Sequence, residues 1–314
     1  MNQTGEVRKN SRLKDYLQLV KPSLSIMVVF SSVVCFLLVP GIDRLYPGAW
    51  LRSILLFVAG MLVTGSANTI NQVVEKDTDA KMKRTATRPV ASGRMSEAHG
   101  WGFAIVTGVL GVGLMWYYFN GTAAVVSAFS LFLYAFVYTP LKKVNAISVF
   151  VGAFPGALPC LIGWVAGTGV LWPAQQYQVP GVAEPFSNFG GWVLFAIQFL
   201  WQFPHFWAIA WVAHRDYSSA GFKLLPSAQG PTKFTALQTI IYSLLLIPVC
   251  ALCYYIGLTG VVSLCIVTAM NLFLVFQCVR LYRENDAKAA RRVMFTSYAH
   301  LAVVLLALLA DKIG

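Results

Sequence analysis

Residues 52–79 read RSILLFVAGMLVTGSANTINQVVEKDTD, and this stretch indicates the fold class. Its first part is a continuous apolar run, and about 20 such residues are enough for a helix to cross the hydrocarbon core of a bilayer. Its second part turns polar at Asn68 and ends in a charged segment between Glu75 and Asp79. The stretch therefore predicts a transmembrane helix that carries polar side chains out of the bilayer at one end.

The rest of the chain repeats this pattern of long apolar runs. Hydrophobic residues make up 57% of the chain and charged residues only 11%, which leaves a water-soluble domain nowhere to place its apolar surface. We therefore predict an all-α, polytopic membrane protein with about nine transmembrane helices. The expected spans lie near residues 24–40, 52–74, 101–119, 121–138, 146–170, 191–212, 234–256, 258–280 and 293–310.

Basic residues gather on one side of the predicted membrane. All but three of the 24 Lys and Arg residues fall on segments that are cytosolic if the amino terminus is, and the exceptions are Arg44, Arg52 and Lys312. Because short cytosolic loops are enriched in Lys and Arg, this predicts a cytosolic N-terminus and an external C-terminus. We expect residues 1–23 to be a basic cytosolic tail and residues 24–314 a single nine-helix transmembrane domain. Basic residues scattered over such loops form no basic folded surface, so nucleic acid is not an expected partner.

Three oxygen-bearing side chains recur at helical spacing where the second span ends. Asn71, Glu75 and Asp79 are four residues apart, so on a continuous helix they line one stripe. Stacked carboxylates repel each other unless a cation lies between them, and hard oxygen ligands suit Mg²⁺. Asp77 joins this set only if the helix end loosens. The alternative is a solvated loop in which acids and bases are mixed for solubility.

Several cations follow this stripe directly. Lys81, Lys83, Arg84 and Arg88 are suited to neutralise the oxygens of a diphosphate, which an arginine binds through parallel hydrogen bonds. The acids and the cations together predict a site for a metal-bound diphosphate.

A second polar block interrupts the sixth span. Gln202 and His205 lie within an otherwise apolar run, and polar groups inside a membrane generally face a cavity or a partner. For His205 the alternative is a histidine packed in the core with its hydrogen bonds satisfied. Asp216 follows on the same cytosolic side, where its carboxylate is a candidate ligand for a second Mg²⁺.

A third block, with Tyr138, Lys142 and Lys143, predicts a tight cytosolic turn before the fifth span. That span is rich in glycine and proline between Gly152 and Trp164, a composition that permits close helix approach and a broken helix. Such a span fits the wall of a cavity, and ordinary helix packing explains it equally well.

These blocks resemble the motifs of the UbiA superfamily of intramembrane prenyltransferases, whose first aspartate-rich motif runs N-x-x-x-D-x-x-x-D. Within the superfamily they are most similar to the protohaem IX farnesyltransferase family, also called haem o synthases. There are two departures: Glu75 stands where the first aspartate is common, and Gln202-Phe203 precede Pro204 where the family often has other residues. Relatives outside this branch carry a second motif, D-x-x-x-D, whose last position is Ala220 here, so a second metal would depend mainly on Asp216. The longer arm of Glu75 is expected to tune metal binding. The matching stretches are residues 71–89, 138–143, 199–207 and 216–226.

The resemblance implies a bundle around a central cavity. It also implies transfer of a farnesyl group from farnesyl diphosphate to the vinyl group of haem b, with addition of water, in the one transmembrane catalytic domain. The implied cofactor is Mg²⁺, with the metal ligands Asn71, Glu75, Asp77, Asp79 and Asp216. The implied catalytic residues are Asn71, Glu75, Asp79, Lys142 and Asp216. The implied substrate-binding residues are Arg84, Arg88, Lys143, Gln202, His205 and Tyr138.

The resemblance further implies a bacterial cytoplasmic (inner) membrane, contact with membrane lipid, and haem a synthase or terminal oxidase assembly as a candidate partner. The first alternative is a UbiA-type prenyltransferase acting on an aromatic acid or a chlorophyllide, against which the His205 block argues. A membrane transporter should show paired repeats with broken helices, and the sequence contains no convincing pair. A haem-binding assembly factor is the third alternative.

Overall fold

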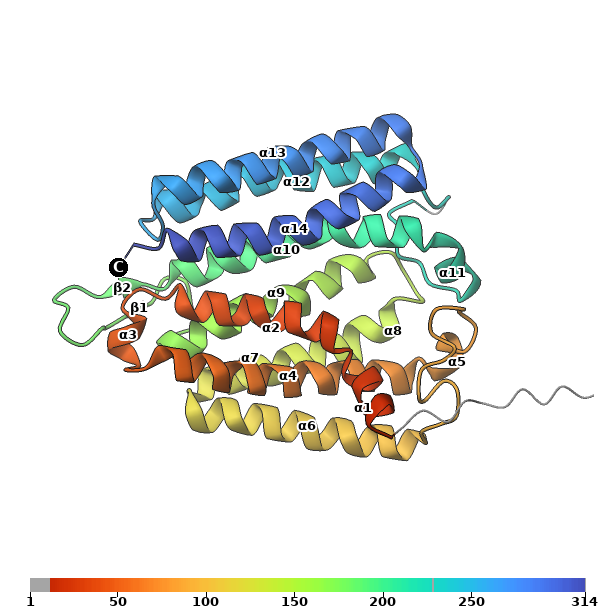
Figure 1. The fold of residues 1–314 in the computed structure, drawn as a ribbon, viewed down its shortest axis with the longest axis horizontal. Coiled ribbons are helices and arrows are strands. Elements are labelled where there is room, and N and C mark those ends of the chain that lie inside the picture. The colour runs from red at the N-terminus through yellow and green to blue at the C-terminus, as the bar shows by residue number, and fades with distance from the viewer. Residues whose placement is uncertain (1–11, 228, 314) are drawn as a thin grey trace, which may run out of the picture.

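The computed structural model describes residues 12–227 and 229–313. Within them the chain forms a bundle of long helices that run side by side, with a small β-hairpin at one end (Figure 1). Arg8 and Lys9 of the expected basic tail lie outside the described residues. The elements in chain order are α1 (Arg12–Val20), α2 (Pro22–Leu37), α3 (Ile42–Leu45), α4 (Ala49–Val74), α5 (Lys76–Asp79), α6 (Glu97–Tyr118), α7 (Gly121–Phe132), the π-helix η1 (Leu133–Tyr138), α8 (Thr139–Leu141), α9 (Ser148–Thr168), β1 (Gln176–Tyr177), β2 (Phe186–Ser187), α10 (Phe189–Val212), α11 (His214–Ser219), α12 (Lys233–Tyr255), α13 (Val261–Glu284) and α14 (Ala287–Ala310).

The predicted all-α, polytopic fold is confirmed. In the described part of the chain, eight helical segments are long and apolar enough to cross a membrane, and α7, η1 and α8 together make one of them. The pair α1 and α2, bent by 44°, makes a ninth if it counts as one span.

Part of the expected basic cytosolic tail forms a helix that packs on the bundle. Residues 12–20 form α1, which packs against α4, and the Gln72 side chain donates hydrogen bonds to the carbonyls of Gln18 and Leu19 at 3.0 and 2.9 Å. These bonds satisfy carbonyl groups that the end of α1 leaves open. The polar composition of this segment hides the helix, because only a few of its side chains, such as Leu19, are buried.

The last span begins earlier than hydropathy predicts. Helix α14 starts at Ala287, six residues before the expected start, because the Asp286 side chain caps it by accepting the Ala289 amide at 2.7 Å. Hydropathy places the start of the span after Lys288, Arg291 and Arg292, because these residues are charged. The cap at Asp286 lets the helix begin before them.

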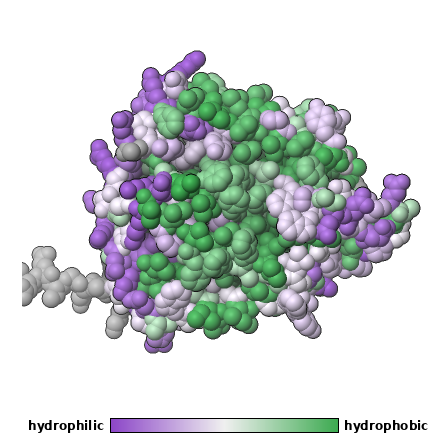
Figure 2. Space-filling model, turned by 180° about the vertical axis from the view of Figure 1, so that it is seen from behind, coloured by the Kyte–Doolittle hydropathy of each residue, from purple (hydrophilic) through white to green (hydrophobic). Residues whose placement is uncertain are grey.

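The outer surface of the bundle is apolar between two polar ends. Figure 2 shows a hydrophobic belt with hydrophilic residues gathered beyond it on either side. Large apolar side chains such as Val109 on α6 and Phe276 on α13 are more than half exposed. A belt of this size is stable against lipid and not against water, so the chain is a multi-pass membrane protein.

The segments with the predicted site residues meet at one end of the bundle. Elements α5, α8 and α11 lie there together with the start of α1, and we call this the α5 end (Figure 1). The hairpin, α3 and the described C-terminal end lie at the opposite end. Segments 75–96, 139–147 and 213–227 are thus neighbours despite their separation in sequence.

Reporter fusions will test the orientation that the basic residues predict. We expect an N-terminal reporter to be cytosolic and a C-terminal reporter to be external, because nine crossings put the two ends on opposite sides. A reporter in the hairpin between β1 and β2 should also be external. Two cytosolic termini would mean an even number of crossings, and the assignment of the span at 293–310 or of the pair in 101–138 would then be wrong.

Candidate active site

A cavity of about 360 Å³ lies inside the bundle among α2, α4, η1, α9, α10 and α14. Its wall is mainly apolar, which suits a long hydrocarbon ligand. Four of the predicted site residues line it, namely Arg84, Tyr138, Gln202 and His205. The structure therefore joins parts of all three sequence blocks around one space.

The predicted acidic stripe lies beside this cavity at the α5 end. The Asn71 side-chain amide donates to Glu75 Oε2, and the Tyr134 hydroxyl donates to Asn71 Oδ1 at 3.3 Å. Glu75 is 4% exposed and Asp79 is fully buried. For these two carboxylates the structure excludes the alternative of a solvated loop.

The helix that carries the stripe is broken, where the sequence pattern predicted a continuous one. Helix α4 ends at Val74, Glu75 has φ −96° and ψ 11°, and α5 starts at Lys76. The Asp79 amide still donates to the Glu75 carbonyl at 2.7 Å, and the Glu75 amide donates to the Asn71 carbonyl at 3.0 Å. These are the i→i−4 backbone hydrogen bonds of an α-helix, and they continue through the break. The side chains of Asn71, Glu75 and Asp79 therefore stay on the same face of the segment.

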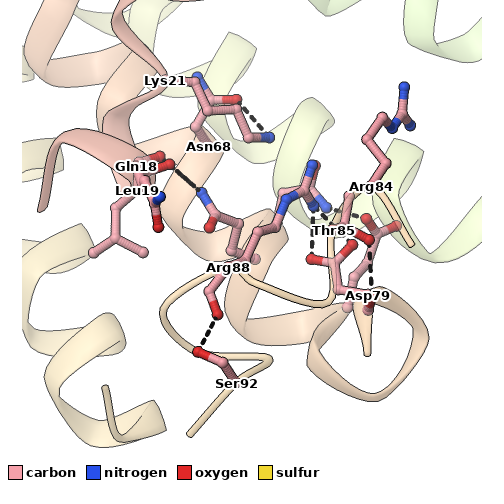
Figure 3. Close-up of polar contacts among 12 residues, drawn as sticks. Gln18, Leu19, Lys21, Asn68, Asp79, Arg84, Thr85, Arg88 and Ser92 are labelled. Atoms are coloured by element: carbon pink, nitrogen blue, oxygen red, sulfur yellow. Dashed lines mark hydrogen bonds and ion pairs between the residues drawn. The ribbon is translucent and has the colours of Figure 1, made fainter. Parts of the chain in front are cut away.

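Each buried carboxylate is paired with a cation of the protein. Arg88 Nη1 lies 2.7 and 2.6 Å from the two carboxylate oxygens of Asp79, as Figure 3 shows. Lys142 Nζ lies 2.8 Å from Glu75 Oε1. The sequence predicted that a metal ion offsets the repulsion between the two carboxylates. In the structure, Arg88 and Lys142, from different segments, offset it.

Burial acts on the charges of both pairs. It raises the pKa of Asp79 above its usual value, against the opposing effect of the Arg88 guanidinium. It lowers the pKa of Lys142, against the opposing effect of Glu75. Arg88 therefore favours the charged form of Asp79, and Glu75 favours that of Lys142. Removing one partner of either pair leaves the other charge unpaired.

The metal set expected from the sequence is not assembled as a whole. In residues 12–227 and 229–313, no three His, Cys, Asp or Glu side chains converge as metal ligands. Asp77 is exposed, because two residues along a helix turn its side chain away from Asp79. Asp216 lies in α11 and makes no ion pair in this part of the chain. The oxygen donors that do lie together are Asn71, Glu75 and Asp79.

The predicted cations divide into two groups. Arg88 and Lys142 pair with the acids, and Arg84 lies at the edge of the cavity, where Nη2 donates to the Tyr217 hydroxyl at 2.8 Å. The Arg84 guanidinium also lies 5.0 Å from the centre of the Tyr217 ring. The exposed group comprises Arg84, Lys81, Lys83 and Lys143.

A further cation is Lys21, which lies within the expected basic tail and which sequence reasoning did not place at the site. Its Nζ donates to Asn68 Oδ1 at 3.4 Å, and Asn68 lines the cavity. The Lys21 charge interacts with both ion pairs, Asp79–Arg88 and Glu75–Lys142. We call Asn71, Glu75 and Asp79 the acidic cluster. Its φ of 50° is unusual for a residue other than glycine and turns the chain between α1 and α2. The signal in the sequence was a basic residue directly before Pro22, at the start of a span.

A π-helical turn places two tyrosines on the cavity. The rings of Tyr134 and Tyr138 are 5.4 Å apart and both line it. Lys142 Nζ lies 4.8 Å from the centre of the Tyr138 ring. Single π-helical turns inside α-helices occur frequently at functional sites. Sequence reasoning found Tyr138 and missed Tyr134.

His205 lies in an aromatic niche of the cavity wall. Its ring stacks on Trp201 at 4.6 Å and 17°, and Tyr298 meets it edge-on at 4.6 Å and 80°. Its Nδ1 lies 2.8 Å from Ser297 Oγ. His205 thus has the partner expected of a packed histidine and also lines the cavity.

Gln202 and the small residues of α9 shape another part of the wall. The Gln202 amide donates to the carbonyls of Ala153 and Gln198 at 3.0 and 3.1 Å, so both of its donor hydrogens serve helix packing. A side chain at Gly156 would overlap Gln202. Gly163 instead lies against the backbone of α2. Both explanations of this span therefore apply: Gly156 belongs to the cavity wall, and Gly163 allows α9 to pack closely against α2.

Known proteins of one family are similar to this chain over most of its length. A family model described as "UbiA prenyltransferase family" matches residues 24–299. The protein named protoheme IX farnesyltransferase in Cytophaga hutchinsonii is 41% identical over 309 residues, which cover 96% of this chain and 99% of the relative.

Solved structures share the fold. One, described in a study of digeranylgeranylglyceryl phosphate synthase in membranes, superposes with a TM-score of 0.73 at 19% identity and covers 95% of this chain and 98% of its own. A UbiA homolog from Archaeoglobus fulgidus, bound to GPP and Mg²⁺, has a TM-score of 0.66 at 16% identity, with coverage of 94% and 99%. At such identities the likeness concerns the fold alone.

Proposed function

The chain belongs to the UbiA prenyltransferase family, and from this premise we infer that it transfers a farnesyl group from farnesyl diphosphate to a vinyl group of protohaem IX (haem b), with addition of water. The products are haem o and diphosphate. The observation that carries this function is the near-full-length similarity to a relative named for that activity. The chain is accordingly a membrane-embedded prenyltransferase with haem and a prenyl diphosphate as substrates.

We propose that the diphosphate of the donor binds against the acidic cluster and its cations. Arg84, Arg88 and Lys142 reach this region from two different segments. Lys21 adds a positive charge that forms no ion pair within the described residues. Fixed cations stabilise the negative charge that develops on the departing diphosphate, and they need no rearrangement at that moment.

We propose Mg²⁺ as the cofactor, held by Asn71, Glu75 and Asp79. Their oxygens are the hard donors that Mg²⁺ prefers, and the Glu75 and Asp79 carboxylates are both buried. The GPP and Mg²⁺ bound to a protein of the same fold support this choice. Bound there, Mg²⁺ would add its charge to the stabilisation of the leaving diphosphate. Arg88 and Lys142, released from their carboxylates, would then face the phosphate oxygens.

We propose that the cavity holds the farnesyl chain and the macrocycle together. Its apolar wall keeps bulk water from the allylic cation that forms as the diphosphate departs. Trp201 and His205 offer flat faces from inside α10, and His205 is the residue that we expect to hold haem b. The acceptor vinyl group then meets the donor between the aromatic niche and the acidic cluster.

We also propose the cytoplasmic membrane of a bacterium as the location, with the α5 end on the cytosolic side. The basic residues of segments 75–96 and 280–292 support this orientation. Haem o is amphipathic and remains in the bilayer. An enzyme that uses it, such as haem a synthase, or the assembly machinery of a terminal oxidase is therefore the partner that we propose.

Identification of the product will test the proposed function. Purified protein in detergent, given haem b, farnesyl diphosphate and Mg²⁺, should form a haem whose mass has increased by one farnesyl group and one water. Liquid chromatography with mass spectrometry will detect it, and omission of farnesyl diphosphate is the control. If haem b stays unmodified while an aromatic acid or a chlorophyllide is prenylated, the acceptor is wrong and the prenyltransferase class survives. If no acceptor is prenylated, the proposed function is wrong.

A further inference from the structure

A hydrogen-bond chain between α10 and α14 is not explained by diphosphate binding or by apolar packing. His205 Nδ1 lies 2.8 Å from Ser297 Oγ, and Ser297 Oγ lies 2.6 Å from the backbone carbonyl oxygen of Met294. Ser297 is fully buried and His205 is 6% exposed. The hydrogen bonds therefore link a fully buried serine to a histidine on the cavity wall.

The direction of these hydrogen bonds follows from counting protons. A serine hydroxyl has one proton, and a backbone carbonyl can only accept. Two oxygen atoms at 2.6 Å require a proton between them, so Ser297 donates to Met294. Ser297 must then accept from His205, and the imidazole carries its proton on Nδ1. The lone pair of the neutral ring is on Nε2.

The other ring nitrogen has no partner in the protein. Within the described residues Nε2 makes no hydrogen bond, yet it is not among the fully enclosed polar atoms that lack one. His205 lines the cavity. Nε2 is therefore the nitrogen that a ligand in the cavity can reach.

The orientation of the ring is fixed as well as its proton. Trp201 stacks on one face of the His205 ring and donates its indole N–H to the Ser297 carbonyl at 2.8 Å. Tyr298, the neighbour of Ser297 in sequence, meets the ring edge-on at 4.6 Å. The same turn of α14 thus holds His205 directly and holds the aromatic ring that stacks on it.

We propose that Ser297 is a positioning residue that fixes the Nδ1–H tautomer of His205, so that Nε2 binds the iron of haem b as an axial ligand. The inference rests on the proposed function, because it takes haem b as the substrate. Metal-bound histidines almost always donate their other ring N–H to a fixed acceptor, which orients the ring and raises its basicity. Ser297 provides this acceptor, and the Met294 carbonyl in turn fixes Ser297.

The alternative ligand group, a haem propionate, fits this niche poorly. A propionate is an anion and needs cations or hydrogen-bond donors, whereas the free nitrogen of His205 is an acceptor. No charged side chain forms a hydrogen bond or an ion pair with His205 in the described part of the chain. Arg84, at the edge of the cavity, is a better match for a carboxylate. The chemistry of the niche therefore favours the iron.

Haem binding in the absence of farnesyl diphosphate will test the proposal on the full chain in detergent. We expect haem b added to the protein to give absorption and resonance Raman spectra of histidine ligation. His205→Ala should lose this signature, and added imidazole should restore it. Ser297→Ala should lower haem affinity by about 10- to 100-fold and weaken the iron–histidine vibration.

Ser127→Ala is the matched control. Ser127 is also a fully buried helical serine that donates to its own helix, to the Ala123 carbonyl at 2.8 Å, but it contacts no histidine. It should keep the wild-type haem spectrum and affinity. The hydroxyl-preserving Ser297→Thr variant should keep the iron–histidine vibration, which a defect of packing alone would not predict.

The outcomes separate this inference from the proposed function. Wild-type protein that farnesylates haem b without a histidine-ligation spectrum would overturn the inference and leave the function intact. An unchanged spectrum and affinity in Ser297→Ala, or a retained histidine signature in His205→Ala, would also overturn it. Protein that prenylates only another acceptor would overturn the proposed function and the inference with it.

Discussion

Replacing Asp79 by asparagine is expected to lower the rate of farnesyl transfer by roughly 100-fold or more while the protein stays folded in the membrane. The substitution keeps the shape of the side chain and removes a buried negative charge that pairs with Arg88. A metal ion that has lost one carboxylate ligand stabilises the leaving diphosphate less. Loss of about 3 kcal/mol of such stabilisation corresponds to a factor of roughly 100 in rate. The measurement is the rate of haem o formation by purified protein at saturating substrates.

Asp77→Asn is the matched comparison for this experiment. It makes the same chemical change two residues away, on a side chain that is exposed and outside the acidic cluster. We expect it to retain most of the activity. A similar loss in both variants would favour the wider ligand set that the sequence suggested. Full turnover in Asp79→Asn, or undiminished turnover of the wild type in excess EDTA, would disprove the metal hypothesis.

Replacing Lys142 by methionine is expected to damage both stability and turnover. The side chains of Lys142 and Glu75 are 9% and 5% exposed and form an ion pair at 2.8 Å. Removing one partner of a buried pair costs about 3–5 kcal/mol, because the other charge is left uncompensated. The site also loses a cation from the region where the diphosphate is proposed to bind. Thermal unfolding in detergent and the rate of haem o formation measure the two effects separately.

A double variant separates the structural role of Lys142 from its chemical role. Lys142→Met combined with Glu75→Gln removes both charges, so no buried ion is left unpaired. We expect the double variant to recover much of the lost thermal stability and none of the lost turnover. Recovery of turnover together with stability would mean that Lys142 acts only through folding.

The neighbouring lysine supplies the control for these variants. Lys143→Met removes the same charge from an exposed position next in the chain. It should leave thermal stability and turnover near the wild-type values. Equal losses in both lysine variants would mean that the net charge of this turn matters and the Glu75 pair does not.

The fold class could be predicted from the sequence because its determinants are local. A run of apolar residues is long enough to cross a bilayer or it is not, and the spans after residue 40 appear as helices close to the expected bounds. The exceptions have local causes that hydropathy does not register. Pro22 with the left-handed Lys21 bends the first span, and the Asp286 cap extends the last one.

The candidate site could be predicted only in part. Spacing along one helix predicted that Asn71, Glu75 and Asp79 lie on one side, and the structure keeps them there through a break in that helix. Spacing also indicated that Asp77 points away from this side on a regular helix, as it does, but it could not predict that Lys143 is exposed beside the buried Lys142. Two adjacent lysines in a turn look alike in the sequence. Which of them is buried depends on the other segments of the fold that pack against the turn.

The sequence by itself determined a polytopic helical bundle, the segments that carry its chemistry, and the resemblance that identified the family. The tertiary structure alone decided which charges meet, since Glu75 pairs with a lysine 67 residues later in the chain and His205 with a serine 92 residues later. Hydropathy and helical spacing describe only a few turns of one helix at a time. Contacts between helices depend on how whole spans pack, so the pairing of charges and the contact of His205 with Ser297 became visible only in the folded bundle.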